Sequence, residues 1–384
     1  MKKKVLFLHA GSELYGADKV LLDLVTGISN EFDCYVILPS TGPLYYEMKK
    51  KMINVSVMKY PILRRKYFNI KGMTSYFFNY LKFSHKISKY IKETKIDLVH
   101  VNTTAVLEGI YLKFFSRVKI LWHVHEIITH PKIVYKFTSF LLNSADKVIT
   151  VSEATKDHIV KSRMIKEEKI KVIYNGINND IYNPKNRIEY LYDELSIPQK
   201  SKIVGMIGRV NSWKGQLDFI EAMEPILKKN EQTFAVLVGG VFEGEDKFLN
   251  DMKKRINESN QKDQFVISDF RSDIANVHNL FDIFVLPSTS PDPLPTVVLE
   301  AMATGKPIVG YNHGGITEMV EHKVNGLLSV PSNPQELSKN IDLILSDKQI
   351  QDEYGRNSFN RQIEKFSMQS YLSNFYKEYS DIIK

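Results

Sequence analysis

Short apolar runs alternate with helical patterns along nearly all of the 384 residues, and this alternation limits the fold more than any other feature. Alternating strands and helices are typical of βαβ units in a mostly parallel sheet. The runs fall into two sets, and strands are expected at Val5–His9, Tyr35–Leu38, Asn54–Met58, Leu98–Asn102, Lys119–His123, Lys147–Val151 and Lys171–Tyr174, then at Ile203–Ile207, Phe234–Val238, Gln264–Ile267, Ile283–Leu286, Pro307–Gly310 and Gly326–Ser329. A chain of this length is too long for one hydrophobic core. The sequence therefore predicts an α/β protein with two doubly wound domains in series.

The two sets of strands are separated by a stretch rich in Asn, Tyr and Pro with weak periodicity. We expect an N-terminal Rossmann-like domain over 1–180, a linker over 181–200 and a second Rossmann-like domain over 201–366. The last segment, 367–384, has apolar residues at helical spacing. We expect this C-terminal helix to pack back on the N-terminal domain.

Composition restricts where the protein works. The 43% hydrophobic and 25% charged content is that of a globular protein, and the single cysteine, Cys34, cannot form an internal disulfide. The apolar run after Lys4 ends at Leu8, which is too short for a signal peptide, and no run reaches the ~18 apolar residues of a membrane span. A cytoplasmic protein is expected, and its net charge of +8 favours an anionic partner.

Two carboxylates eight residues apart, Asp292 and Glu300, bracket a loop that enters a helix near Thr296. A carboxylate near a helix start can accept hydrogen bonds from two vicinal hydroxyls of a sugar or ribose. The spacing alone fits equally well a helix cap followed by a solvated glutamate.

The segment from Pro287 to Val309 resembles the E-x7-E motif of the family 4 retaining glycosyltransferases, and its Glu-Ala-Met-Ala core begins at Glu300. Other landmarks of this family follow in the same order, and they are Gly16-Ala17-Asp18-Lys19, His125-Glu126, Val151-Ser152, Tyr174-Asn175-Gly176-Ile177, Val204–Val210 with Lys214-Gly215, Val238-Gly239-Gly240, Phe270–Ile274, Phe281–Ser288, Gly314–Glu318 and Asn325-Gly326-Leu327. The resemblance implies the GT-B fold, two Rossmann-like domains facing each other across a cleft. It also implies the kind of enzyme that builds bacterial surface polysaccharides.

The activity implied by this resemblance is retaining transfer of a sugar from a nucleoside diphosphate sugar to a glycan or lipid-linked glycan acceptor. The second domain would hold the nucleotide, and the first would shape the acceptor site. Same-face attack and a covalent intermediate both remain open as mechanisms. Two other functions are compatible with the fold: a catalytically idle subunit that binds a partner or a membrane, and a GT-B sugar-nucleotide epimerase.

The resemblance also assigns site residues. Arg209 and Lys214 would face the donor diphosphate, where arginine grips oxygens bidentately, lysine acts as a point charge, and both stabilise the leaving group. No metal ion or other cofactor is expected, because two side-chain cations and helix N-termini take that role. The catalytic residues are expected to be His125, Arg209, Lys214 and Asp292, and the donor-binding residues Gly16, Gly208, Arg209, Lys214, Gly239, Gly240, Phe270, Arg271, Leu294, Thr296 and Glu300.

His125 is chosen from two candidates. Strand alternation places His123 and His125 on one face, and the family's histidine precedes an acidic residue, as His125 does. Three departures from the family pattern are visible: Tyr15 and Pro295 stand where glycine is common, and Asp292 replaces the usual glutamate. Asp292 reaches one methylene less far, and Pro295 has no N–H to offer a phosphate.

A basic and aromatic stretch runs from Lys59 to Lys95 and contains a single acid, Glu93. Lysines and arginines interleaved with aromatic rings suit an anionic bilayer or a lipid diphosphate, and they also suit single-stranded nucleic acid. The alternative is an ordinary helix pair with aromatic residues in the core and solvated lysines. We expect contact with the acceptor or with an anionic membrane surface, peripheral on the inner face of the cytoplasmic membrane, and no nucleic acid; the residues expected to make it are Arg64, Arg65, Lys66 and Lys71.

Overall fold

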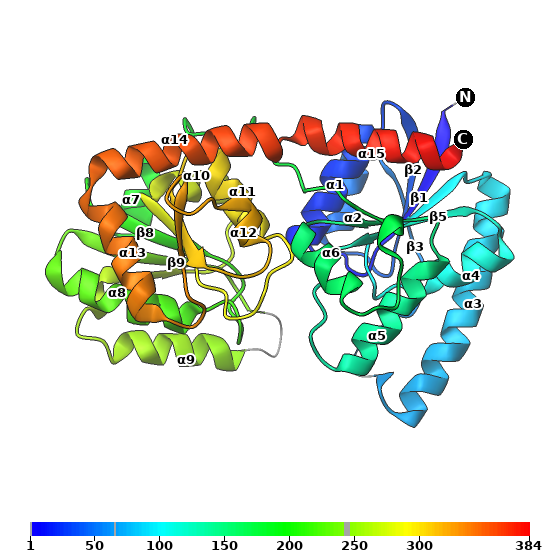
Figure 1. Cartoon of the computed structure of the whole chain (residues 1–384), viewed down its shortest axis with the longest axis horizontal. Helices are drawn as coiled ribbons and strands as arrows, with labels where there is room; N and C mark the ends of the chain where they lie inside the picture. Colours follow the sequence, from blue (N-terminus) through cyan, green and yellow to red (C-terminus); the bar gives the residue numbers. More distant parts are fainter. Residues whose placement is uncertain (1, 65–66, 242–245) are drawn as a thin grey trace. The chain divides into compact units, whose positions relative to one another are not determined.

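The computed structural model describes residues 2–64, 67–241 and 246–384. The chain divides into two compact units, each built around one parallel sheet (Figure 1). The first unit combines Met1–Asn175 with Gln369–Lys384, and the second is the continuous segment Gly176–Met368. Arg65 and Lys66, two of the basic residues expected to meet the acceptor, lie outside the described residues.

The sheet of the first unit has seven strands in the order β3-β2-β1-β4-β5-β6-β7. These strands are β1 (Lys3–Leu8), β2 (Phe32–Leu38), β3 (Asn54–Val57), β4 (Leu98–Val101), β5 (Lys119–Val124), β6 (Lys147–Thr150) and β7 (Ile170–Val172). Its helices are α1 (Gly16–Ile28), α2 (Pro43–Lys50), α3 (Ile70–Thr94), α4 (Glu108–Phe115), α5 (Lys132–Leu141), α6 (Glu153–Val160) and α15 (Met368–Ile383). The strand order reverses at β1, which pairs with both β2 and β4. Ligands of doubly wound sheets bind outside the carboxyl ends of strands at such a switch point.

The second unit repeats this design with six strands in the order β10-β9-β8-β11-β12-β13. The strands are β8 (Lys202–Ile207), β9 (Thr233–Val238), β10 (Phe265–Ser268), β11 (Ile283–Leu286), β12 (Ile308–Tyr311) and β13 (Gly326–Ser329). The helices are α7 (Glu189–Glu194), α8 (Gln216–Lys229), α9 (Asp246–Asn257), α10 (Ile274–Leu280), α11 (Thr296–Ala303), α12 (Ile316–Met319), α13 (Pro334–Ser346) and α14 (Lys348–Lys365). Here the order reverses at β8, between β9 and β11. The thirteen strands of the two sheets coincide, within a few residues, with the apolar runs of the sequence, because strands covered on both faces are apolar throughout.

The C-terminal helix α15 belongs to the first unit. The hydroxyl of Tyr379 lies 2.5 Å from Nδ1 of His100 on β4, and the ring of Phe375 lies 5.0 Å from that of His123 on β5. Nζ of Lys171 also donates to the carboxylate of Glu378 at 2.5 Å. This helix therefore covers the strands with a buried aromatic face.

The segment 181–200, expected as a linker, lies inside the second unit. It contains α7, whose Leu191 is fully buried, and Ile197 is buried after it. Tyr190 donates a hydrogen bond to Asp273 at 2.5 Å. The chain passes between the units at Asn175, because the apolar side chains that follow are covered by the second unit.

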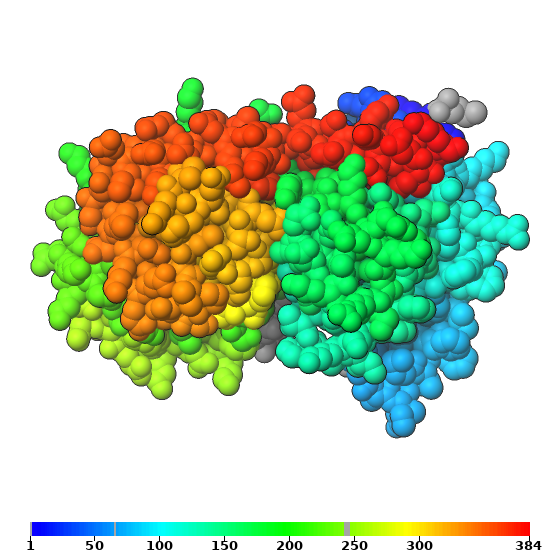
Figure 2. All heavy atoms as spheres, in the orientation of Figure 1, coloured from blue at the N-terminus to red at the C-terminus, as the bar shows by residue number. Residues whose placement is uncertain are grey.

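The long helix α3 has two halves of different character. Its C-terminal half buries Ile87 and Ile91 in the core of the first unit. Its N-terminal half exposes large apolar residues, among them Ile70 and Phe77, and extends past the neighbouring elements of this unit (Figures 1 and 2). Across the described parts of the chain, no helix has an apolar run long enough to cross a membrane.

Candidate active site

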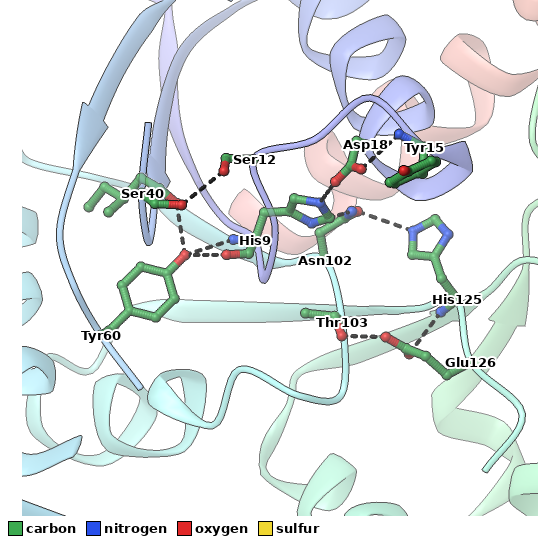
Figure 3. A network of polar contacts seen from close by, with 11 residues as sticks. His9, Ser12, Tyr15, Asp18, Ser40, Tyr60, Asn102, Thr103, His125 and Glu126 are labelled. Carbon is green, nitrogen blue, oxygen red and sulfur yellow. Dashed lines mark hydrogen bonds and ion pairs between the residues drawn. The ribbon is translucent and has the colours of Figure 1, made fainter. Parts of the chain in front are cut away.

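In the first unit, the candidate site residues lie at the ends of three neighbouring strands, β1, β4 and β5. His125 follows β5, Asn102 follows β4 and His9 follows β1 (Figure 3). Nε2 of His125 lies 3.2 Å from Oδ1 of Asn102 and 3.2 Å from Nδ1 of His123. His123 and His125 therefore do share a face, as strand alternation predicts.

A chain of hydrogen bonds runs from His125 to the start of α1. Nδ2 of Asn102 lies 3.1 Å from Nδ1 of His9, and Nε2 of His9 lies 2.6 Å from Oδ1 of Asp18 (Figure 3). A carboxylate oxygen of Asp18 accepts from Nε2–H of His9, and we assign Nδ1 of His9 as the acceptor for the Asn102 amide N–H. The amide oxygen of Asn102 is then left to accept from Nε2–H of His125. Asp18 thereby fixes the tautomer of His125, whose Nδ1 becomes the acceptor nitrogen.

Burial disfavours the charged form of three histidines in this cluster, His125, His123 and His100. Desolvation, aided by the nearby His9, lowers the pKa of His125 to about 3. Burial also lowers the pKa of His123, and it lowers that of His100 to about 3. His125 is partly exposed, so a neutral imidazole is presented to ligands and acts through hydrogen bonds rather than charge.

Glu126 holds the backbone at His125. Its carboxylate accepts from the hydroxyl of Thr103, from the Thr104 N–H at 3.4 Å and from the His125 N–H at 3.2 Å. Burial raises the pKa of this carboxyl. The loops after β4 and β5 are thus tied together, which fixes the direction of the imidazole.

The first loop of the chain accommodates Tyr15 without strain. Tyr15 has φ −84° and ψ −178°, an extended conformation open to any residue, and its N–H donates to Asp18 at 2.9 Å. Gly16 is the first residue of α1. The tightness of this turn is therefore independent of a glycine at position 15.

In the second unit, the candidate site is built largely from backbone. The loops that follow β8 and β9 touch at two glycines: a Cβ on Gly239, whose φ is +150°, would lie 2.0 Å from the carbonyl oxygen of Gly208. A Cβ on Gly215, with φ +82°, would lie 1.8 Å from the carbonyl oxygen of Pro287, in the loop after β11. Side chains are excluded at both points, so backbone N–H groups can come close to a ligand. Gly240 adjoins the same loops, since Val210 donates to its carbonyl at 3.0 Å.

Lys214 and Asp292 form an ion pair at the carboxyl end of this sheet. Nζ of Lys214 lies 2.8 Å and 3.0 Å from the two carboxylate oxygens, and Ser288 donates to Asp292 at 2.7 Å. Asp292 is buried, and Nζ also lies 4.5 Å from the ring centroid of Trp213. Two residues expected in the catalytic set are thereby brought into direct contact.

The other expected donor residues lie around this pair in different environments. Arg209 is partly exposed, and its carbonyl accepts from Gln216 at 3.0 Å. Leu294 is buried, and Thr296 is the first residue of α11. Phe270 leaves 59% of its surface exposed in the loop after β10.

Arg271 is engaged in ion pairs. Its guanidinium donates to Asp273 at 2.7 Å and to Glu194 of α7 at 2.6 Å. These carboxylates raise the pKa of the guanidinium above its already high value. The side chain fastens α7 to the start of α10, a structural task that its position in the sequence does not reveal.

Glu300 is buried within α11, with only 3% of its surface exposed. One carboxylate oxygen lies 3.2 Å from Nε2 of the fully buried His278 on α10. Sequence reasoning missed His278, along with His9, Asp18 and Asn102. The pairings join residues from different elements, so spacing gives no signal for them.

In the described ranges, no group of three or more His, Cys, Asp or Glu side chains could hold a metal ion.

Comparison with known proteins agrees with this geometry. Residues 15–181 match the family described as "Glycosyltransferase Family 4", and residues 189–361 match "Glycosyl transferases group 1". The fold is shared with Anabaena Alr3699/HepE, solved in complex with UDP and glucose, at a TM-score of 0.86 and 26% identity over 98% of this chain and 99% of that one. Two Rossmann-like units with these sites define a GT-B glycosyltransferase.

The chain belongs to glycosyltransferase family 4. Among its relatives, the UDP-Gal:alpha-D-GlcNAc-diphosphoundecaprenol alpha-1,3-galactosyltransferase of Escherichia coli is 25% identical over all of this chain and 98% of its own length. The N,N'-diacetylbacillosaminyl-diphospho-undecaprenol alpha-1,3-N-acetylgalactosaminyltransferase of Campylobacter jejuni is 26% identical over 91% of each chain.

Proposed function

We propose that this glycosyltransferase moves a sugar from a uridine diphosphate sugar to a saccharide carried on a lipid diphosphate, with retention at the anomeric carbon and without a metal ion. The reaction would serve surface polysaccharide synthesis at the inner face of the cytoplasmic membrane. The observation that carries the proposal is the Lys214–Asp292 pair, set among the glycine-lined loops where the strand order of the second sheet reverses.

The donor assignment is supported by both chemistry and similarity. In the reaction, the bond between the anomeric carbon and the diphosphate oxygen breaks, and the electron pair leaves with the diphosphate. Arg209 and Lys214 would stabilise the negative charge that develops there. HepE, 26% identical, has been solved with UDP-glucose. Asp292, held between Lys214 and Ser288, would accept from sugar hydroxyls, and Glu300 from those of the ribose.

The acceptor assignment is supported by two relatives that cover at least 90% of this chain and act on diphosphoundecaprenol-linked saccharides. His125, a neutral imidazole held by Asn102, would hydrogen-bond the transferred sugar. Glu126 holds its backbone, and Asn102, in contact with His9 and Asp18, holds its imidazole.

The membrane assignment is supported by charge. Arg64 and Lys71 are exposed beside the exposed apolar half of α3. Each basic residue near an anionic surface contributes about 1 kcal/mol. Sedimentation with anionic and neutral vesicles should show binding only to the anionic ones, and added salt should weaken it. Equal partition to both kinds, or to neither, would remove this part of the proposal.

The direct test is a transfer assay with UDP-, GDP- and ADP-sugars and a synthetic saccharide on a lipid diphosphate. We expect turnover with a UDP-sugar in excess EDTA, and a product whose new linkage has the anomeric configuration of the donor by NMR. An inverted linkage would refute retention. Loss of turnover with EDTA that manganese or magnesium restores would refute the metal-independent mechanism.

A further inference from the structure

A polar pocket of about 570 Å³ lies in the first unit, beside the loop that follows β1. Its lining residues include three cations, Lys59, Arg64 and Lys82, and one acid, Glu13. The three cations are exposed and come from two separate elements, the strand-to-helix connection before α3 and α3 itself. Such a cavity suits a ligand with more than one negative charge, because the summed potential of three cations acts on one small volume.

This polar pocket is joined to the histidine network. Tyr60, one of its walls, accepts from the His9 N–H at 3.0 Å and donates to the His9 carbonyl at 2.5 Å (Figure 3). Ser12 and Ser40, also in its lining, lie 2.8 Å apart by their hydroxyls. A ligand in the polar pocket would therefore be one residue away from the chain of hydrogen bonds that ends at His125.

An apolar groove of about 700 Å³ lies between α3, the start of α4 and α5. Its lining includes Met73 and Phe77 of α3 and Ile133 and Phe137 of α5, with exposed fractions of 49%, 55%, 77% and 49%. Large apolar side chains gathered in a concave, open site mark a place where apolar ligand surface is buried. Met73, Tyr76 and Phe77 bring the N-terminal half of α3 into this groove.

The polar pocket and the apolar groove adjoin. Tyr67 lines the pocket, Tyr76 lines the groove, and their ring centroids are 5.2 Å apart. The lining also alternates along the chain: Leu63 belongs to the groove and Arg64 to the pocket. The contact between Tyr67 and Tyr76 therefore joins the edge of the basic pocket to the edge of the apolar groove.

We propose that the pocket and the groove together form one site for a polyisoprenoid diphosphate, with the diphosphate among Lys59, Arg64 and Lys82 and the start of the isoprenoid chain in the apolar groove. This site would hold the carrier end of the acceptor, and it rests on the proposed function for its biological meaning. The three cations of the pocket favour a lipid that carries a diphosphate, because a neutral lipid would bring no negative charge to them. A bilayer surface would touch the rim of the groove without filling the pocket.

The test uses farnesyl diphosphate as the probe, with inorganic diphosphate and farnesol as its two halves. In titrations of the full chain, farnesyl diphosphate should bind more tightly than either half. Phe77→Ser should weaken binding of farnesyl diphosphate by about tenfold and leave inorganic diphosphate unchanged. Arg64→Ser with Lys82→Ser should weaken both.

Two neighbouring residues of α3 provide matched controls. Phe78 is 71% exposed and Lys86 is exposed, and neither lines the pocket or the groove. Phe78→Ser and Lys86→Ser should leave the affinity for farnesyl diphosphate unchanged, and melting temperatures should show that all variants are folded. Equal losses for Phe77→Ser and Phe78→Ser would overturn the groove assignment, and so would equal affinity for farnesol and farnesyl diphosphate. Anionic vesicles are expected to bind in any case through exposed cations outside the pocket such as Lys71, so the affinity of the variants for farnesyl diphosphate decides the site.

Two measurements, sugar transfer to a lipid-linked acceptor and binding of farnesyl diphosphate, separate this inference from the proposed function. If transfer to a lipid-linked acceptor occurs but farnesyl diphosphate does not bind, only the carrier site is wrong. If farnesyl diphosphate binds with the expected pattern of variants but no sugar is transferred, the site stands and the proposed function fails.

Discussion

The two units share one design of sheet but place different groups at the ends of their strands. In the second unit, loops after neighbouring strands meet at Gly208, Gly215 and Gly239, and one ion pair, Lys214–Asp292, lies among them. In the first unit, side chains that follow β1, β4 and β5 form the chain of hydrogen bonds that runs from Asp18 through His9 and Asn102 to His125, called the relay below. Backbone N–H groups are available to a ligand whatever the neighbouring side chains are, whereas the orientation of His125 depends on the side chains that contact it. The largest single loss of activity should therefore follow from a substitution in the first unit, at His125.

The largest effect should follow from His125→Ala, which we expect to abolish transfer while UDP affinity stays nearly unchanged, because the histidine belongs to the other unit. Its neighbour is the control: His123 is fully buried against Phe375, so His123→Ala should lower the melting temperature more than the turnover of the folded enzyme. Kinetics on both variants measures turnover, and calorimetry measures the affinity for UDP and the melting temperature. The reverse ranking of turnover would assign the catalytic role to His123.

Arg209→Ala and Lys214→Ala should each lower kcat by roughly 10²–10³, the usual loss when a group that stabilises developing charge is removed. Lys214→Ala also leaves Asp292 buried without its cation, so Asp292→Asn should restore part of the lost stability but none of the activity. Lys228→Ala, an exposed lysine of α8, is the control. Unchanged kcat in both Arg209→Ala and Lys214→Ala would mean that other groups stabilise the developing charge.

Glu300→Gln should weaken binding of UDP by about tenfold or more, since a charge-assisted hydrogen bond contributes roughly 1.5–3 kcal/mol. The exposed Glu353 of α14 gives a matched control, Glu353→Gln. Calorimetry with UDP measures both. Unchanged affinity in the first variant would confine Glu300 to a structural pairing with His278.

Asp18→Asn should lower kcat by about tenfold and leave the KM for the donor unchanged, because a neutral amide no longer fixes the tautomers of His9 and His125. Asp18→Glu should restore part of the activity, which a purely structural role would not predict. The carboxylate also accepts from Tyr15, so melting temperatures must be compared with those of Glu153→Gln, an acid in the first turn of α6.

The last prediction concerns stability rather than activity, and it compares two buried carboxyls. Glu300 lies against His278, whereas Glu108 is fully buried near Tyr60, Tyr76 and Tyr80, and burial raises its pKa from 4.5 to about 8. Between pH 4.5 and 8 the folded chain keeps a proton that the unfolded chain releases, so this group lowers stability as pH rises, by at most about 1.4 kcal/mol per pH unit.

Glu108→Gln should remove that dependence. The variant should melt close to the wild type near pH 5 and above it at pH 8. Equal shifts at both values would show that Glu108 is ionised in the folded chain.

The sequence predicted the sheets well and the site unevenly. Apolar runs mark strands covered on both faces, so the strands were found, and the spacing of Asp292 and Glu300 located the loop before α11. The relay was missed because β1, β4 and β5 are neighbours only through the strand order, which brings His9 within reach of Asn102, a residue far along the chain. The aromatic residues of α3 were ambiguous for a related reason. Helical periodicity does not show that only the C-terminal half of α3 packs on the core, and for this reason Ile87 is buried whereas Phe77 is exposed.

The position of α15 has a consequence for how the two units fold. The first unit joins two separate stretches, Met1–Asn175 and Gln369–Lys384, whereas the second unit can fold from one uninterrupted stretch. Until α15 docks, its aromatic face, with Phe375 and Tyr379, is missing from the first sheet, and Phe7 and His100 lack this cover. Completion of the first unit therefore depends on contacts between residues far apart in the sequence, which form more slowly than local ones.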